Sequence, residues 1–107
     1  MTNINSVAME VILNAGDARE LIDRSLDTMA KLDFPTAENL LEEADEKIIK
    51  AHNEQTKIIQ RQAAGENTEY SLLFIHAQDT MMTINTELRM ARKMLPIFLA
   101  LYNKTKG

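Results

Sequence analysis

The stretch that decides the fold runs from residue 70 to residue 102 and reads YSLLFIHAQDTMMTINTELRMARKMLPIFLALY. Apolar residues recur in it at steps of three and four, which predicts a long helix, from about residue 69 to 103, with an apolar stripe. Pro96 is expected to bend this helix, and residues 103–107 are expected to fray. The predicted stripe consists of Tyr70, Phe74, Ala77, Met81, Ile84, Leu88, Ala91, Leu95, Phe98 and Tyr102.

The same helix carries a second set of apolar residues. Because successive residues turn by about 100° along an α-helix, this set falls opposite the stripe and cannot reach the same core. One chain offers no fourth helix to cover the second set, so we expect a homo-oligomer built on it. This second set, the spare face, consists of Leu72, Ile75, Met82, Met90 and Ile97.

Two further segments, about residues 4–31 and 36–63, show the same helical period. Gly16 interrupts the first; because a glycine inside a helix costs up to about 1 kcal/mol relative to alanine, we expect a neighbouring backbone to approach it closely. Short breaks between three long helices predict an all-α fold, an antiparallel up-down-up three-helix bundle in a single domain spanning residues 1–107. The two stripes are Ile4, Ala8, Val11, Ala15, Ala18, Ile22 and Met29, and Ala37, Leu41, Ala44, Ile48, Ala51, Gln55, Ile58 and Gln62.

The breaks themselves carry residues that end and start helices. In the first break, Asp33 or Thr36 is suited to cap the second helix, and Pro35 is tolerated in a first helical turn. In the second break, Gly65 is suited to the left-handed conformation that follows a helix, and Thr68 is suited to cap the third helix.

Composition excludes several classes of function. The chain has 107 residues, of which 45% are hydrophobic and only 5% aromatic, which favours helices over sheets. Its net charge is −4 with the basic residues scattered, so we expect no nucleic-acid partner. The absence of cysteine removes disulfides, thiolate chemistry and zinc-thiolate sites. Without a leader-like N-terminus or an apolar run long enough to span a bilayer, a cytoplasmic protein with no membrane insertion is predicted.

Chemistry, if the chain performs any, is expected at His76. Asp79 lies at the centre of the spare face, and His76 lies about 60° around the helix from it, at the margin of that face. Copies of Asp79 brought together at a symmetry axis would need protonation, pairing or a cation, whereas a loose seam would leave Asp79 solvated. His76 has a second interpretation as an ordinary surface histidine at an interface edge. We interpret the other histidine, His52, as a packing or surface residue.

The residues around His76 resemble those of a known family. Residues 71–79, SLLFIHAQD, followed by Met82 and Thr83, resemble the phosphorylation-site motif of the lactose/cellobiose-class IIA components of the bacterial phosphoenolpyruvate-dependent sugar phosphotransferase system. Residues 15–19, AGDAR, and residues 51–59, AHNEQTKII, resemble the first-helix and second-helix signatures of that family. The resemblance keeps the same order and spacing over nearly the whole chain.

This resemblance implies a phosphoryl carrier. His76 would accept a phosphoryl group from HPr and pass it to the cognate IIB component, serving the uptake and phosphorylation of a β-glucoside or galactoside disaccharide such as cellobiose, chitobiose or lactose. The run from His76 to Gln78 favours the cellobiose or chitobiose branch over lactose. The resemblance also implies a homotrimer with a divalent metal, Mg²⁺, on its axis, held by Asp79 from each subunit.

The chain departs from the family at one position next to the site. Family members commonly carry a second histidine directly after the aspartate, where this chain has Thr80, so any assistance from that imidazole is absent or replaced.

Two other classes of function are open from the sequence. A histidine phosphotransfer module of two-component signalling would also place a histidine on a bundle helix, and a non-catalytic helical interaction protein would leave His76 unphosphorylated by any donor. The identity of the phosphoryl donor separates these classes.

Overall fold

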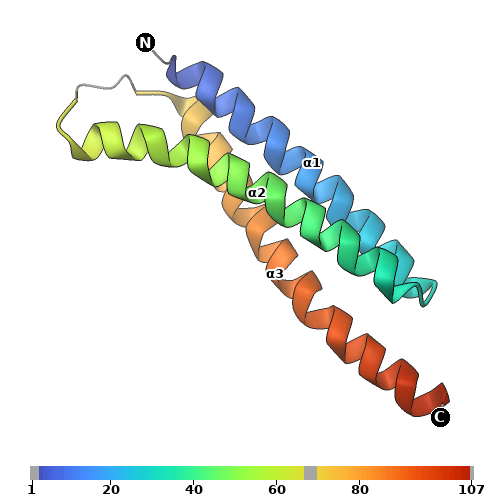
Figure 1. Ribbon diagram of the computed structural model, residues 1–107. Helices are drawn as coiled ribbons and strands as arrows, with labels where there is room; N and C mark the ends of the chain where they lie inside the picture. Colours follow the sequence, from blue (N-terminus) through green and yellow to red (C-terminus); the bar gives the residue numbers. More distant parts are fainter. Residues whose placement is uncertain (1–2, 67–69, 107) are drawn as a thin grey trace.

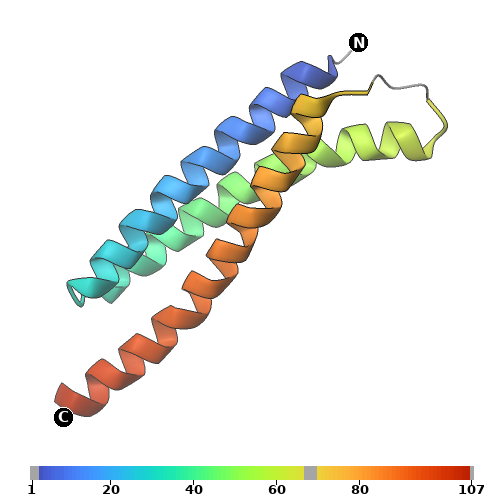
Figure 2. The ribbon, with the colours of Figure 1, turned by 180° about the vertical axis from the view of Figure 1, so that it is seen from behind.

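The computed structural model describes residues 3–66 and 70–106, and within those ranges it contains three helices and no strand. The helices are α1 (Ile4–Ala30), α2 (Phe34–Ala63) and α3 (Leu72–Lys106). In Figure 1, α2 runs back along α1, and α3 sets out again from the end where the N-terminus lies. The bundle measures 61 × 20 × 18 Å, and α3 extends past the turn between α1 and α2 (Figures 1 and 2). The predicted all-α three-helix bundle is confirmed.

The core is made of the stripes that the helical period predicts. Every predicted position of α1 is buried, as is every predicted position of α2 except the exposed Gln62, and in α3 the predicted positions from Phe74 to Ala91 are all buried. Alanines recur at fully buried positions of all three helices, which lets their backbones approach closely. Over the described residues, no helix combines the length and apolarity that crossing a membrane requires.

Two predicted core positions in the α3 stripe are wrong, and both lie near its ends. Tyr70 precedes the first turn of α3 and is 82% exposed. Phe98 is 45% exposed, while Leu95, Leu99 and Tyr102 pack against the core at that end. A period of 3.6 residues allows either the third or the fourth residue after Leu95 to face inward, and the structure turns Leu99 inward.

The first break is fixed by local hydrogen bonds. Asp33 caps α2, because its Oδ1 accepts a hydrogen bond of 3.3 Å from the amide of Thr36. Helix α2 therefore begins at Phe34, two residues earlier than predicted, with Pro35 in its first turn. Leu32 adopts a positive φ of 65°, which the sequence pattern did not indicate, and the amide of Asp33 then donates to the carbonyl of Thr28 to close the end of α1.

The later helix ends agree with expectation at Gly65 and differ from it at the C-terminal end of α3. Gly65 has the predicted left-handed conformation, with φ at 84°, whereas Thr68 lies outside the described residues. Helix α3 contains Pro96 and continues to Lys106, so residues 103–106, which were expected to fray, are helical in the structure. Lys106 lies over the ring of Tyr102 at 5.7 Å from its centroid, and its charge suits the C-terminal end of the helix dipole.

The explanation expected for Gly16 is also wrong. A Cβ added at Gly16 would meet no atom within 4 Å, and the residue is exposed. No neighbouring backbone therefore requires a glycine at this position, and the helix accepts its entropic cost without a contact in return.

The two glycines give a matched pair of substitutions with opposite expected signs. Gly16→Ala should raise the free energy of unfolding by about 0.5–1 kcal/mol, because the position is helical and open. Gly65→Ala should lower it by about 1 kcal/mol, because alanine is strained at a φ of 84°. Urea unfolding at one protein concentration measures both values. A loss of stability in Gly16→Ala would mean that something packs against this position in solution.

Candidate functional site

The spare face of α3 is exposed along its whole length. Its five residues, from Leu72 to Ile97, are each between 46% and 69% exposed. These side chains line one side of a helix whose other side fills the core, so they cannot be buried by a rearrangement within the chain. Exposed apolar side chains gathered on one side of a helix in this way are typical of a protein interface.

The start of α3 is tied to the start of α1. Ser71 caps α3, because its Oγ accepts a hydrogen bond of 3.1 Å from the amide of Phe74. The same hydroxyl donates to Oδ1 of Asn5 at 2.7 Å. The sequence pattern did not single out Ser71, although its place three residues before Phe74 was a usable signal, and the predicted cap, Thr68, lies outside the described residues. This pair fixes the first turns of α3, which carry His76, relative to α1.

His76 is exposed on α3, one turn after the Ser71 cap. Thr80 follows one turn later, and its hydroxyl donates to the backbone carbonyl of His76 at 2.8 Å. The Thr80 proton is therefore committed to the helix backbone and not to the imidazole. His52 is also exposed, on α2, in agreement with its interpretation as a surface residue.

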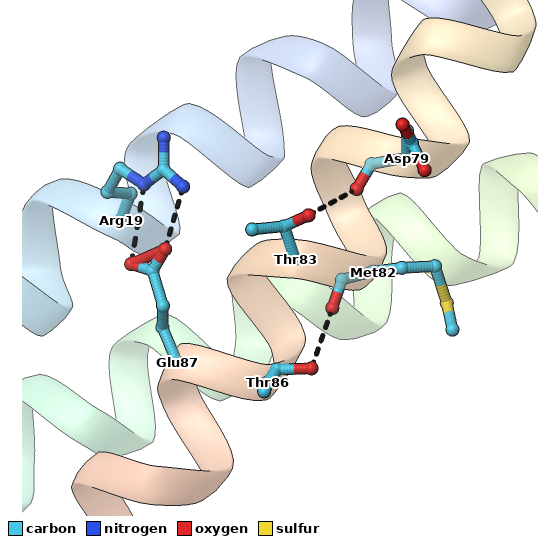
Figure 3. Close-up of polar contacts among 6 residues, drawn as sticks. All are labelled: Arg19, Asp79, Met82, Thr83, Thr86 and Glu87. Atoms are coloured by element: carbon cyan, nitrogen blue, oxygen red, sulfur yellow. Dashed lines mark hydrogen bonds and ion pairs between the residues drawn. The ribbon is translucent and has the colours of Figure 1, made fainter.

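Asp79 is exposed on α3, between the spare-face residues Ile75 and Met82. Figure 3 shows that the bond from the Thr83 hydroxyl, 2.9 Å long, ends on the backbone carbonyl of Asp79 and leaves its carboxylate unused by Thr83. Within the described part of one chain, no three His, Cys, Asp or Glu side chains are grouped so as to hold a metal ion. A metal at Asp79 would need carboxylates from more than one copy.

An ion pair between Arg19 and Glu87 joins α1 to α3. The guanidinium of Arg19 contacts Glu87 through two atoms, with Nη2 at 2.7 Å from Oε2 and Nε at 3.4 Å from Oε1 (Figure 3). The hydrogen bonds that Arg19 donates to Glu87, and then the negative charge of that carboxylate, raise the pKa of Arg19 above its usual range. Both side chains are more than one third exposed, so solvent screens the pair.

Arg19, His76 and Asp79 line a single polar hollow together with Thr80 and Thr83. At about 170 Å³ the hollow is smaller than the pockets that usually hold small-molecule ligands, which begin at about 300 Å³. It is therefore unsuited to enclosing a disaccharide. A small charged group on His76 would lie near both the carboxylate of Asp79 and the side chain of Arg19.

Comparisons with known proteins all point to the same family. Residues 6–99 match the family described as "PTS system, Lactose/Cellobiose specific IIA subunit". Among curated proteins, the lactose-specific EIIA component of Staphylococcus epidermidis is 39% identical over 80 residues, which cover 75% of this chain and 77% of that protein.

Two solved structures are similar in fold. The cellobiose-specific enzyme IIA of Bacillus anthracis has 34% identity and a TM-score of 0.88, covering 100% of this chain and 96% of that one. The IIA protein of the N,N'-diacetylchitobiose branch of the Escherichia coli phosphotransferase system, solved in complex with HPr, has 26% identity and a TM-score of 0.81, covering 95% of this chain and 99% of that one.

The Ser71 cap gives a local prediction. Ser71→Ala should loosen the first turn of α3 by about 1 kcal/mol, because the amide of Phe74 loses its acceptor and the link to Asn5 is broken. Hydrogen exchange should then accelerate at the amides of Phe74 and Ile75. Ser6→Ala, at an exposed position of α1, serves as the control and should leave these amides unchanged. Equal protection in both variants would contradict the assignment of Ser71 as the cap.

Proposed function

Since this chain belongs to the lactose/cellobiose-specific IIA family of the phosphotransferase system, we propose that it carries a phosphoryl group on His76 from HPr to its cognate IIB component. The observation that carries the proposal is the exposure of His76 on a rigid helix within the segment that the family matches. A protein partner can reach the imidazole directly, with no loop or domain movement in this chain.

The chemistry suits a histidine. A neutral imidazole nitrogen is nucleophilic near neutral pH, and the phosphohistidine that forms is a good donor for onward transfer. In the forward step, the bond from phosphorus to the donor atom of phosphorylated HPr breaks as the bond from phosphorus to a ring nitrogen of His76 forms. The donor atom recovers the electron pair of the broken bond. The second step, to IIB, repeats this exchange with His76 as the leaving group.

Little covalent work is left to the protein, so positioning and charge compensation supply most of the rate. The Ser71 cap and the buried stripe of α3 fix the helix that presents His76. Thr80 does not replace the imidazole that relatives commonly carry at this position, because its hydroxyl proton is held by the carbonyl of His76.

HPr is the proposed donor because a similar IIA protein has been solved in complex with HPr. The acidic balance of this chain, with a net charge of −4, is compatible with a basic donor surface around the docking site. The relay would operate on the cytoplasmic side of the membrane, where IIB would deliver the phosphoryl group to a sugar as it enters the cell.

We also propose that the chain forms a homotrimer of antiparallel bundles, with the three spare faces packed together. The support is the exposed apolar side of α3, which one chain cannot cover. Asp79 lies within this face, so a threefold axis there would bring three carboxylates together. A divalent metal with oxygen ligands, Mg²⁺, would offset their repulsion, and Asp79 from each subunit would hold it.

The hollow beside His76 is too small to enclose a disaccharide, so this site would handle the phosphoryl group and not the sugar. We propose a β-linked disaccharide of the cellobiose, chitobiose or lactose type. The support is that similar proteins are described as lactose-specific, as cellobiose-specific and as belonging to the N,N'-diacetylchitobiose branch.

His76→Ala should abolish labelling of the chain from phosphoenolpyruvate in the presence of the general carriers, because it removes the imidazole that is proposed to accept the phosphoryl group. His52→Ala is the matched control: it removes the chain's other histidine, which is exposed on α2, and should leave labelling unchanged. Intact-mass measurement detects the acid-labile phosphoryl adduct. Persistent labelling of His76→Ala would remove His76 as the acceptor.

Asp79→Asn tests the shared metal separately from the chemistry. If Mg²⁺ bridges three carboxylates, chelation by EDTA should weaken the wild-type trimer, and Asp79→Asn should make the assembly insensitive to both Mg²⁺ and EDTA. Asp27→Asn, at an exposed position of α1, is the control and should keep the wild-type response. Light scattering across a dilution series measures the assembly. A wild-type trimer that ignores EDTA would exclude a stabilising metal at Asp79.

A further inference from the structure

The polar hollow beside His76 contains one permanent cation. Of the five side chains that line it, Arg19 alone carries a fixed positive charge, and Asp79 carries a negative one. A phosphoryl group on His76 would bring a charge of about −1.5 to −2 into the same space. With Asp79 engaged by the shared metal proposed above, Arg19 is the side chain of the hollow that remains to compensate the phosphoryl charge.

Hydrogen-bond donors in the hollow are mostly committed elsewhere. The hydroxyl of Thr80 donates to the carbonyl of His76, and the hydroxyl of Thr83 donates to the carbonyl of Asp79. Neither threonine has a second proton to offer a phosphoryl oxygen. Arg19 is different, because a guanidinium has five N–H groups and its contact with Glu87 uses two atoms.

Arg19 is also held weakly. Its contact with Glu87 lies in solvent, with side-chain exposures of 46% and 37%, and exposed ion pairs contribute little to stability. A phosphoryl group is a stronger partner for a guanidinium than a single solvated carboxylate, because it offers more charge and more acceptor oxygens. Figure 3 shows Arg19 and Glu87 on the side of Thr83 away from Asp79, and Arg19 already lines the hollow that contains His76.

We propose that Arg19 exchanges Glu87 for the phosphoryl group when His76 is phosphorylated, and so acts as the phosphoryl-binding residue of this site. Arg19 forms no covalent bond and transfers no proton; it donates hydrogen bonds to the phosphoryl oxygens in the transition state and in phosphohistidine. Glu87 holds the guanidinium beside the hollow while His76 is unmodified. The proposal rests on the function proposed above, in which His76 is the acceptor.

Three variants separate this role from a structural one. Arg19→Gln should lower kcat for phosphorylation by phosphorylated HPr about 10- to 100-fold, the factor expected for loss of a charged hydrogen bond. Arg19→Lys should retain part of the rate, since it keeps the charge without the planar fork. Glu87→Gln should not slow the reaction and should raise kcat by up to about fivefold, because it frees Arg19.

Opposite effects of Arg19→Gln and Glu87→Gln are the signature of the exchange. If the ion pair only braced α1 against α3, both variants would slow the reaction alike, and that result would overturn the proposal. A loss confined to the KM for HPr would also overturn it, since it would make Arg19 a docking residue. Arg24→Gln, at an exposed position of the same helix, is the control and should keep the wild-type kcat.

A second measurement does not depend on HPr. In a His52→Ala background, phosphoramidate would label His76 as the chain's only histidine, and ³¹P NMR would follow the titration of its phosphoryl group. A nearby guanidinium favours the dianion, so the phosphoryl pKa should be higher in Arg19→Gln than with Arg19 present. An unchanged phosphoryl pKa in Arg19→Gln would refute the contact. If Arg19→Gln proved too unstable to measure, the phosphoryl pKa would be titrated in Arg19→Lys and Glu87→Gln in its place.

These experiments also distinguish failure of the proposed role of Arg19 from failure of the proposed function of His76 as phosphoryl acceptor. If the chain with Arg19 intact takes no phosphoryl group on His76 from phosphorylated HPr, the proposed function fails. If that chain is phosphorylated and Arg19→Gln behaves identically in rate and pKa, only the role of Arg19 fails.

Discussion

Helix α3 carries apolar residues on two sides, and a single chain can bury only one of them. Phe74, Ala77 and Met81 are buried against α1 and α2, which fixes the rotation of the helix about its axis. Turning α3 by one residue, about 100°, would bring His76 or Asp79 toward the core, where an unpaired charge is costly. The exposure of both residues is thus a consequence of core packing and not of any interaction made by the residues themselves.

The middle of each helix was predictable because its side chains alternate between core and solvent with a regular period. Burial of the α3 stripe from Phe74 to Ala91 follows directly from that period. The ends were less predictable, since they depend on single hydrogen bonds and local dihedral angles. Asp33 and Ser71 determine where α2 and α3 begin, and Tyr70 falls outside the core because α3 starts after it. At Gly16, the sequence suggested a close contact, but three-dimensional packing provides none.

The candidate site also contains one part that the sequence predicts and one part that it does not. His76 and Asp79 share one helix, so their relation follows from sequence spacing alone, and their exposure follows from the stripe. Arg19 and Glu87 lie 68 positions apart on different helices, and their contact depends on the axial shift and rotation of α1 against α3. Periodicity specifies which face each helix turns inward but not that shift. The participation of α1 in the hollow therefore became visible only in the structure.

A phosphoryl carrier must bind its cargo firmly enough to accept it and loosely enough to release it. Donors already aimed at phosphohistidine would stabilise that state as much as the transition states on either side, which would slow onward transfer. In this chain, the nearby threonine hydroxyls are occupied by backbone carbonyls, and the nearby guanidinium is occupied by Glu87. Under the proposed exchange, every hydrogen bond from Arg19 to the phosphoryl group is offset in part by the loss of its contact with Glu87. The return of Glu87 to Arg19 then favours release to IIB, so the ion pair opposes acceptance slightly and assists onward transfer.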